Sequence, residues 1–429
     1  MPDSAPTPRQ VTIKTVVSLC AIFGGLQLAE EISNNVLPLT LRRFTGSASL
    51  IGIILAIHPL FGFIAQPVVG ILGDRIWTRV GRRAFFLVTC APLAGLCLVA
   101  LPHMAAFWQL VVVVVLFQLF LALLWGSDHP LITDLVPAGR RTVVKGWMMT
   151  AGHVCSFFFV KFGVGYAIDR FGEASVYRIA AGGMIVLVAF AALFLNETPV
   201  TPAPRPKLTV RRYVMDLLGD RILRRFALLG FVYSAFVNIV IGFAVLFAVQ
   251  TVKISKAEFG SAWSTQALLA LVCAIPLGLA IERLPKQWAL FTGFVFAVGG
   301  CVCGYFADTA QSFYAIALLF GFGYVIVEVT IKPFFSEYLP TDIVGQLTGA
   351  YNICYATGRV TALVGAGWVV SHAGNDYRVI WLLAICFGAL SAIVAATIPD
   401  LRYAARRAAK RATSAAGSAD FSPAWPAAK

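Results

Sequence analysis

Twelve apolar segments, each about as long as a membrane-spanning helix, dominate this sequence. An α-helix needs ~20 mostly apolar residues to cross the hydrocarbon core of a bilayer. The composition agrees, because 59% of the 429 residues are hydrophobic and 13% are charged, whereas average soluble domains have ~45–50% and ~25%. The sequence therefore predicts an all-α membrane protein, and it excludes an ordinary soluble enzyme, a coiled coil and a disordered chain. The expected spans are 12–38, 47–70, 84–103, 106–135, 142–168, 176–196, 226–251, 259–283, 287–307, 312–337, 346–371 and 377–398.

The net charge of +14 comes from basic residues that gather in alternate loops. If both termini are cytoplasmic, the cytoplasmic segments hold about three times as many Lys and Arg residues as the outer segments. This asymmetry follows the positive-inside rule. We therefore expect an integral protein of the cell membrane with both termini cytoplasmic. The lipid bilayer accounts for the basic balance, so no nucleic-acid partner is expected.

The two halves of the sequence repeat each other. Segment 130–146 matches segment 333–349 at a constant offset of 203 residues. A weaker match, at an offset of 208, links the Gly-x₃-Asp-Arg after span two to the Gly-x₃-Glu-Arg after span eight. Parallel repeats of this kind are typical of transporters whose substrate site lies between the halves near the membrane midplane. We therefore expect two pseudo-symmetric six-helix bundles, residues 1–196 and 226–398, with a cytoplasmic linker at 197–225 and a disordered cytoplasmic tail at 399–429.

The loop between spans two and three carries the most detailed motif, GILGDRIWTRVGRR at 70–83. Its glycines permit close helix approach at a membrane-embedded end, and its charged side chains can bond to a neighbouring helix. Such a loop can hold the two bundles together on the cytoplasmic side and release them as they rock apart. The alternative is a basic loop that only sets topology. We expect this latch to comprise Gly70, Asp74, Arg75, Gly81, Arg82 and Arg83, with Asp134 and Glu337 at matching positions of the repeat.

On these motifs the chain resembles the major facilitator superfamily over residues 12–398. The stretch 58–83 resembles more narrowly the sugar:cation symporters of the glycoside–pentoside–hexuronide type and their sucrose-transporting relatives. Those proteins commonly show a proline in span two, then D-R and G-R-R, as Pro67 and loop 70–83 do here. The chain departs from them after Arg83, where the family often continues R-P. Sodium-coupled members carry an Asp in span two, and 47–70 has none, so the resemblance favours protons over sodium.

Ionisable residues within apolar spans are costly to bury and are therefore functional candidates. Glu30 and Glu31 point ~100° apart on a helix, so both cannot face one cavity. Lys161 is placed to pair with one of them, and Glu328 with Lys332 one turn away. The resemblance implies that helices one, four, seven and ten line the cavity, where buried acids can bind substrate and carry a proton, because burial favours the neutral carboxyl form. The alternative for each residue is a static salt bridge. The full set is Glu30, Glu31, Asp128, Lys161, Glu328 and Arg359.

Polar and aromatic side chains in the same spans suit a sugar. Gln27 and Asn34 lie in span one, Trp125 in span four and Asn238 in span seven. Amides hydrogen-bond hydroxyl groups, and an indole ring can stack on a sugar ring. The alternative is ordinary contact between helices, for which membrane proteins also use polar side chains.

The sequence contains no P-loop and no nucleophile or metal-ligand motif. We therefore expect no catalytic residues, no metal and no cofactor. Our hypothesis is a secondary active transporter that moves a sugar or glycoside together with a proton by alternating access. One alternative is a carrier of another small solute, such as a drug or organic-anion exporter or a metabolite carrier. The other is a membrane-embedded enzyme or receptor without transport.

Overall fold

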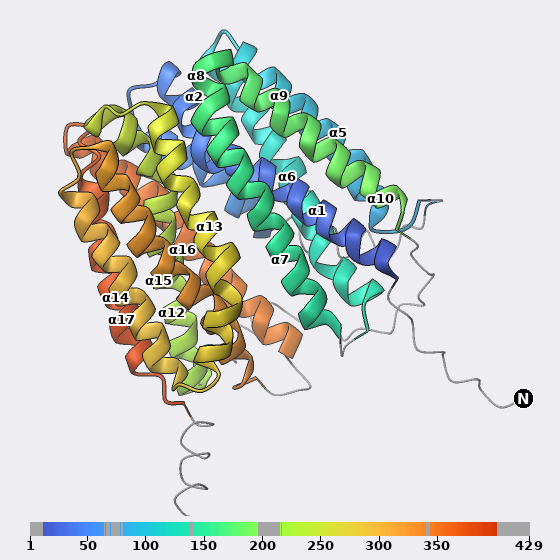
Figure 1. The fold of residues 1–429 in the computed structure, drawn as a ribbon, viewed down its shortest axis with the longest axis vertical. Helices are drawn as coiled ribbons and strands as arrows, with labels where there is room; N and C mark the ends of the chain where they lie inside the picture. Colours follow the sequence, from blue (N-terminus) through green and yellow to red (C-terminus); the bar gives the residue numbers. More distant parts are fainter. Residues whose placement is uncertain are drawn as a thin grey trace, which may run out of the picture.

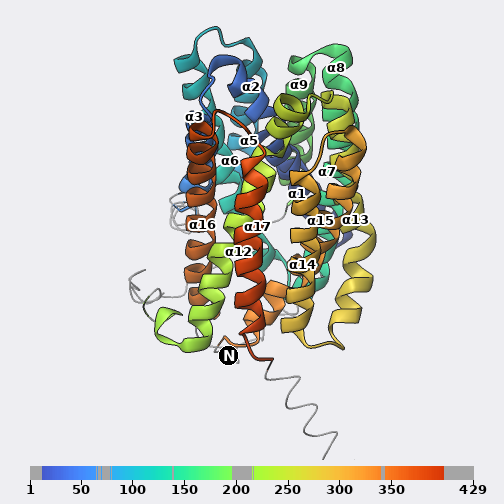
Figure 2. The ribbon, with the colours of Figure 1, turned by 90° about the vertical axis from the view of Figure 1, so that its left-hand side faces the viewer.

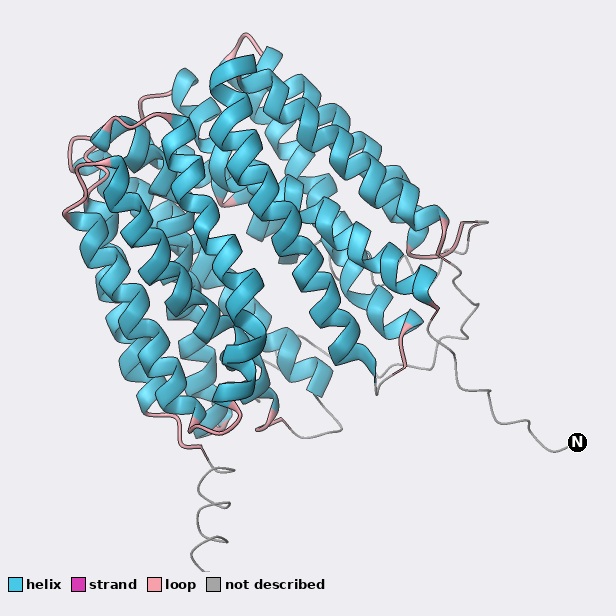
Figure 3. Cartoon of the chain, viewed as in Figure 1, coloured by secondary structure: helices cyan, strands magenta, loops and turns pink. Residues whose placement is uncertain are grey.

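The computed structural model is helical throughout the part of the chain that it describes (Figure 3). Among the described residues, eleven helices are long and apolar enough to cross a membrane, and a shorter apolar helix, Ala48–Phe63, lies where the second span is expected. The all-α membrane fold predicted from the sequence is thus confirmed. The described residues are 12–63, 65, 69, 78, 80–137, 140–195, 215, 217–339 and 344–400.

The first half of the chain contains six of these apolar segments, several interrupted by π-helical turns. Pro38 sits in the first turn of α2, where the missing N–H is not needed for a helical hydrogen bond. The elements are α1 (Ile13–Glu31), η1 (Ile32–Val36), α2 (Leu37–Phe44), α3 (Ala48–Leu55), α5 (Ala84–Ala100), η2 (Leu101–His103), α6 (Phe107–Leu135), α7 (Arg141–Phe158), η4 (Phe159–Ala167), α8 (Ile168–Phe171), α9 (Glu173–Met184), η5 (Ile185–Phe190) and α10 (Ala191–Leu193).

The second half begins earlier than the sequence suggests. Asp220 accepts hydrogen bonds from the backbone of Ile222 and Leu223, both at 2.8 Å, and this cap starts α12 within the expected linker. Most of the linker and tail, residues 196–214, 216 and 401–429, lies outside the described residues. The elements are α12 (Arg221–Leu246), η6 (Phe247–Val252), α13 (Lys256–Ile281), α14 (Lys286–Tyr305), α15 (Ala310–Ser336), α16 (Val344–His372) and α17 (Val379–Ala396).

The helices of each half pack mainly on one another. Helix α1 packs on α7 and α5 on α6, whereas α12 packs on α16 and α17, beside which it lies in Figure 2. Helix α12 is almost wholly buried, whereas α13 is the least buried of the described spans. Large apolar side chains such as Ile275 of α13 are exposed, as expected of residues that face lipid, because acyl chains are as apolar as the side chains themselves.

The two halves meet on one side of the molecule and diverge toward the other (Figure 1). The side on which they diverge is the one where α1 begins and α17 finishes. At the meeting end the Ser49 hydroxyl lies 2.9 Å from that of Ser371, and Asp169 accepts a hydrogen bond from the Ala257 backbone at 3.2 Å. These contacts join α3 to α16 and the α8 region to α13. The structure is therefore closed at this end.

Glycines make that closure possible. A Cβ atom on Gly52 would lie 2.2 Å from the carbonyl oxygen of Leu363, and one on Gly367 would lie 2.5 Å from that of Ala48. On the other pair of helices, a Cβ atom on Gly260 would lie 2.6 Å from the Cα of Gly165. Backbones can approach this closely only where side chains are absent. Gly52 and Gly260 are 208 residues apart, which is the offset of the sequence repeat in these two helices.

Candidate functional site

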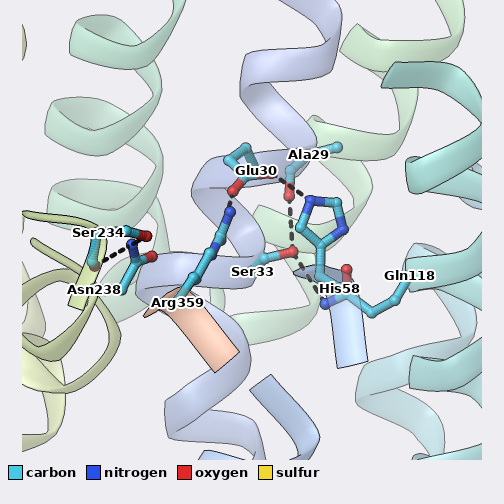
Figure 4. A network of polar contacts seen from close by, with 8 residues as sticks. All are labelled: Ala29, Glu30, Ser33, His58, Gln118, Ser234, Asn238 and Arg359. Atoms are coloured by element: carbon cyan, nitrogen blue, oxygen red, sulfur yellow. Dashed lines mark hydrogen bonds and ion pairs between the residues drawn. The ribbon is translucent and has the colours of Figure 1, made fainter. Parts of the chain in front are cut away.

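A pocket lies between the two halves, about midway along their helices. Its lining is mostly polar and comes from both halves: η1, the helix Ala48–Phe63 and α6 on one side, and α12 and α16 on the other (Figure 4). The first half contributes Ser33, Asn34, Leu55, His58 and Gln118, and the second half contributes Asn238, Gly242, Arg359 and Leu363.

An ion pair crosses between the halves beside this pocket. The Arg359 guanidinium donates a hydrogen bond to Glu30 at 2.9 Å. His58 Nε2 lies 3.3 Å from the other oxygen of the same carboxylate, so Glu30 faces two basic groups from two different helices (Figure 4). The side chains of Glu30 and Arg359 are only 17% and 20% exposed. Charges this well removed from water need each other, because a buried charge without its partner is strongly destabilising.

The neighbouring Glu31 has different surroundings. Its carboxylate accepts hydrogen bonds from the Ser156 hydroxyl of α7 and from the Asn35 amide of η1, the latter at 2.7 Å. Among the described residues it has no ion-pair partner. The two adjacent acids thus point to different partners, as the helical geometry predicted, and only Glu30 is neutralised by a base.

Two amides of the pocket are held by hydrogen bonds to their own half. Gln118 Nε2 donates to the Ser33 hydroxyl at 3.4 Å, and that hydroxyl donates to the Ala29 carbonyl at 3.3 Å. Asn238 Nδ2 donates to the Ser234 carbonyl at 2.8 Å. Asn238 was predicted from the sequence as a site residue, whereas Ser33, His58 and Gln118 were not. The available signal was a lone glutamine in the middle of the apolar run of span four.

A second group of ionisable residues lies nearer the ends at which the halves diverge. Glu328 of α15 accepts a hydrogen bond from the Tyr233 hydroxyl at 2.8 Å and lies 3.8 Å from Lys332. The expected pairing one helical turn apart is therefore present. Asp128 is fully buried, and its nearest oxygen lies 4.0 Å from the Lys145 ammonium of α7. Each pair stays within its own half.

Three candidates from the sequence lie away from the pocket. Lys161 is exposed and contacts the rings of Phe157 and Phe162; no ion pair joins it to Glu30 or Glu31. The expected pairing is absent, because Lys161 lies on the exposed side of η4, beside the exposed ring of Phe162. Gln27 packs toward α7, and Trp125 makes an edge-to-face contact with Phe23 at 5.5 Å.

The described part of the latch joins helices of one half rather than the two halves. Arg82 donates to Asp134 at 2.7 Å, and Arg83 contacts the same carboxylate at 3.4 Å. In the second half Lys286 pairs with Glu337. Arg83 and Lys286 are 203 residues apart, as are the two acids, so the repeat includes both partners. Gly81 has a φ of +122°, which suits glycine in the turn before Arg82. Gly70, Asp74 and Arg75 lie outside the described residues.

Replacing Asp134 with asparagine is expected to lower the free energy of unfolding by about 2 kcal/mol, because two largely buried arginines lose a charged acceptor. Thermal unfolding of the detergent-purified protein measures this. Asp308→Asn is the matched control, since Asp308 is 69% exposed where it meets Arg378 and surface pairs contribute less than about 1 kcal/mol. Equal losses of stability in the two variants would contradict a structural role specific to Asp134.

Comparison with known proteins places this architecture in a family. The family model described as Major Facilitator Superfamily matches residues 19–242 and again residues 226–428. A general alpha-glucoside permease of Schizosaccharomyces pombe is 25% identical over 177 residues, which cover 35% of this chain and 31% of the permease. The match thus spans about a third of that relative's length.

Solved structures with the same fold are many and distant in sequence. The nucleoside transporter NupG superposes with a TM-score of 0.71 at 11% identity, covering 90% of this chain and 100% of NupG. A bacterial homologue of the lysosomal transporter Spinster, in an inward-facing and unoccupied conformation, gives 0.69 at 14% identity, covering 90% and 96%. A peptide transporter of the POT family gives 0.68 at 12% identity, covering 90% and 96%. Because a family model matches almost the whole chain and the fold agrees, this protein belongs to the major facilitator superfamily of membrane transporters.

Proposed function

We propose that this protein is a secondary active transporter that carries a sugar or glycoside together with a proton by alternating access. The observation that carries the proposal is the polar pocket between the halves, lined by residues of both, with the Glu30–Arg359 ion pair beside it. A solute bound there touches both moving parts. The printed name of the S. pombe relative, an alpha-glucoside permease, supports the substrate class.

The charges around the pocket suit an uncharged solute. Among the described acids around the pocket, Glu30, Glu328 and Asp128 each lie close to a base, so this part of the interior carries little net charge when Glu31 is protonated. A neutral polar molecule can then bind without a charged partner of its own, and desolvating it costs far less than desolvating an ion. The pairs are Glu30 with Arg359, Glu328 with Lys332, and Asp128 with Lys145.

Glu31 is our candidate for the proton carrier. It is the acid of span one whose partners, Ser156 and Asn35, are neutral hydrogen-bond donors. Such an acid can take up a proton without breaking an ion pair, whereas protonating Glu30 would release Arg359. It also sits on the α1–η1 junction next to the residue that joins the halves, so its protonation can bias how the halves meet.

The direction of opening follows from the proposed topology. With both termini in the cytoplasm, the closed end faces outward and the structure is an inward-facing state. Residues 1–196 and 226–398 would rock as two bodies about the pocket, with 197–225 as the linker between them. The outward-facing state would require the contacts of Ser49 with Ser371 and of Gly165 with Gly260 to separate.

Glu31→Gln should abolish proton-driven accumulation of substrate while leaving exchange across the membrane within a few-fold of wild type. Glutamine keeps the hydrogen-bonding shape of the side chain but cannot take up a proton. Proteoliposomes with and without an imposed pH gradient provide the measurement. Glu328→Gln and Asp128→Asn are the matched variants, and loss of accumulation in either of them with normal accumulation in Glu31→Gln would move the proton site to that residue.

Substrate class is tested by uptake of a panel of labelled sugars and glycosides into the same proteoliposomes. Saturable accumulation of at least one of them supports the proposal. No saturable uptake of any sugar, together with transport of a drug, organic anion or other metabolite, would replace it with that alternative.

A further inference from the structure

The orientation of the Gln118 amide is fixed by its neighbours. The Ser33 hydroxyl donates its single proton to the Ala29 carbonyl, so toward Gln118 it can only accept. Gln118 must therefore turn its NH₂ group to Ser33, as the 3.4 Å contact shows. Its carbonyl oxygen Oε1 is then the atom left over. That oxygen is buried and has no hydrogen-bond partner among the described residues, and the side chain lines the pocket.

His58 presents a second unpaired acceptor. Its Nε2 lies 3.3 Å from the Glu30 carboxylate, which also accepts from Arg359 and has no proton to offer. With the Nε2 hydrogen turned toward Glu30, the ring presents its other nitrogen, Nδ1, as the acceptor of that tautomer. Nδ1 is buried without a hydrogen-bond partner in the described structure, and His58 lines the same pocket as Gln118 (Figure 4).

Asn238 adds a third acceptor from the opposite half. Its Nδ2 donates to the Ser234 carbonyl, which cannot donate in return, so the amide orientation is again fixed. Its Oδ1 makes no hydrogen bond to any described residue. Arg359 supplies the balancing donor, because its Nε–H is buried and unpaired although its terminal nitrogen holds Glu30.

We propose that Gln118, His58 and Asn238 form an acceptor face that selects solutes by their hydrogen-bond donors and rejects anions that have none. This inference rests on the proposed transport function and adds the residues that determine specificity. Three acceptors and one donor match neighbouring hydroxyl groups, each of which can donate to one acceptor, while one of them also accepts from the Arg359 Nε–H. An ionised carboxylate would bring further acceptors and leave all three unpaired. An ammonium group would meet the Arg359 charge.

The selectivity is expected to be large because the acceptor atoms of Gln118 and His58 are buried. A ligand that fails to pair a buried polar group loses about 1–3 kcal/mol per group, which corresponds to roughly 5- to 150-fold in affinity. Fluorine can replace a hydroxyl group of a glycoside and removes its hydrogen-bond donor. At the hydroxyl position that meets Gln118 or Asn238, this replacement should therefore weaken binding by about 10- to 100-fold.

The test compares ligands and variants by calorimetry on the purified full-length protein. The ligands are maltose, sucrose and methyl α-glucoside, together with the monodeoxyfluoro analogues of methyl α-glucoside and the acceptor-only dicarboxylates succinate and fumarate. We expect binding of at least one hydroxyl compound and none of the dicarboxylates. Gln118→Leu should lose about 10- to 100-fold in affinity for that compound. Gln266→Leu is the matched control, because the Gln266 amide also has an unpaired buried nitrogen but does not line the pocket.

Three results would overturn the acceptor face: binding of a dicarboxylate, binding of none of the hydroxyl compounds, or unchanged affinity in folded Gln118→Leu. If that variant does not fold, the fluorinated analogues test the same point on the wild-type protein, and full affinity for every analogue would contradict the proposal. Hydroxyl-compound binding without proton-driven uptake would refute the transport proposal alone. Proton-driven accumulation of a dicarboxylate would refute the acceptor face and leave proton-coupled transport intact.

Discussion

Arg359→Gln is expected to abolish transport and to lower the free energy of unfolding by about 3–5 kcal/mol, the usual result of breaking a buried ion pair by removing one partner. The variant leaves Glu30 charged, largely buried and facing only His58. Thermal unfolding of the purified protein and uptake into proteoliposomes measure the two effects. Because Arg359 also offers its Nε–H to the pocket, transport should fall further than stability alone explains.

Two further variants separate the causes. Glu30→Gln combined with Arg359→Gln removes both charges, so stability should largely recover while transport stays lost. Lys161→Gln is the matched control, since it exchanges an exposed lysine that contacts only aromatic rings, and surface substitutions usually change stability by less than about 0.5 kcal/mol. Near-normal uptake by Arg359→Gln would show that the ion pair serves neither binding nor the coupling of the halves.

Gly260→Leu is expected to reduce transport at least 100-fold, because the two halves can then no longer pack together at the closed end of the molecule. The Cβ atom alone would overlap the backbone of Gly165 at 2.6 Å, and backbone cannot move aside as a flexible side chain can. The closed state would be lost without loss of the separate bundles. Gly52→Leu should act in the same way, because its Cβ would lie 2.2 Å from the Leu363 carbonyl oxygen.

Accessibility of the closed end measures this directly. Ser371→Cys, in a background without the nine native cysteines, should react slowly with a membrane-impermeant maleimide and faster once Gly260→Leu is added. Gly278→Leu is the matched control on the same helix, where a Cβ meets nothing within 4 Å. Labelling and transport that respond equally to Gly278→Leu and Gly260→Leu would show that the glycine contact is not what closes this end.

The spans were predictable because the bilayer imposes a simple rule on sequence. A lipid environment requires long apolar helices, so hydropathy located the segment Ala84–His103 and helix α6 to within a residue. The exceptions have local causes. Helix α12 starts early because Asp220 caps it, and the described helix at the second span, Ala48–Phe63, is shorter than expected.

From the sequence, the candidate site was predictable only as a set of residues whose burial in a membrane span costs free energy. Glu30, Asn34, Asn238 and Arg359 stood out because polar groups are rare in apolar spans, and all four lie at or beside the pocket. Lys161 stood out for the same reason, yet it lies outside the site. The rarity of polar residues in apolar spans therefore identifies candidates for a functional site. The direction in which each side chain points depends on helix rotation and on π-helical turns such as η4.

The amino-acid sequence by itself determined the helical membrane fold, the repeat and the list of ionisable residues, because these depend on hydropathy and spacing along one chain. Only the tertiary structure decided that Glu30 meets Arg359, 329 residues away, while Glu31 meets uncharged donors. Neighbours on a helix face different directions, so a step of one residue changes which partner is in reach. The packing of the two halves, which glycines allow to approach closely, therefore gives two adjacent and chemically identical acids different roles. Glu30 forms the ion pair between the halves, and Glu31 is the candidate proton carrier.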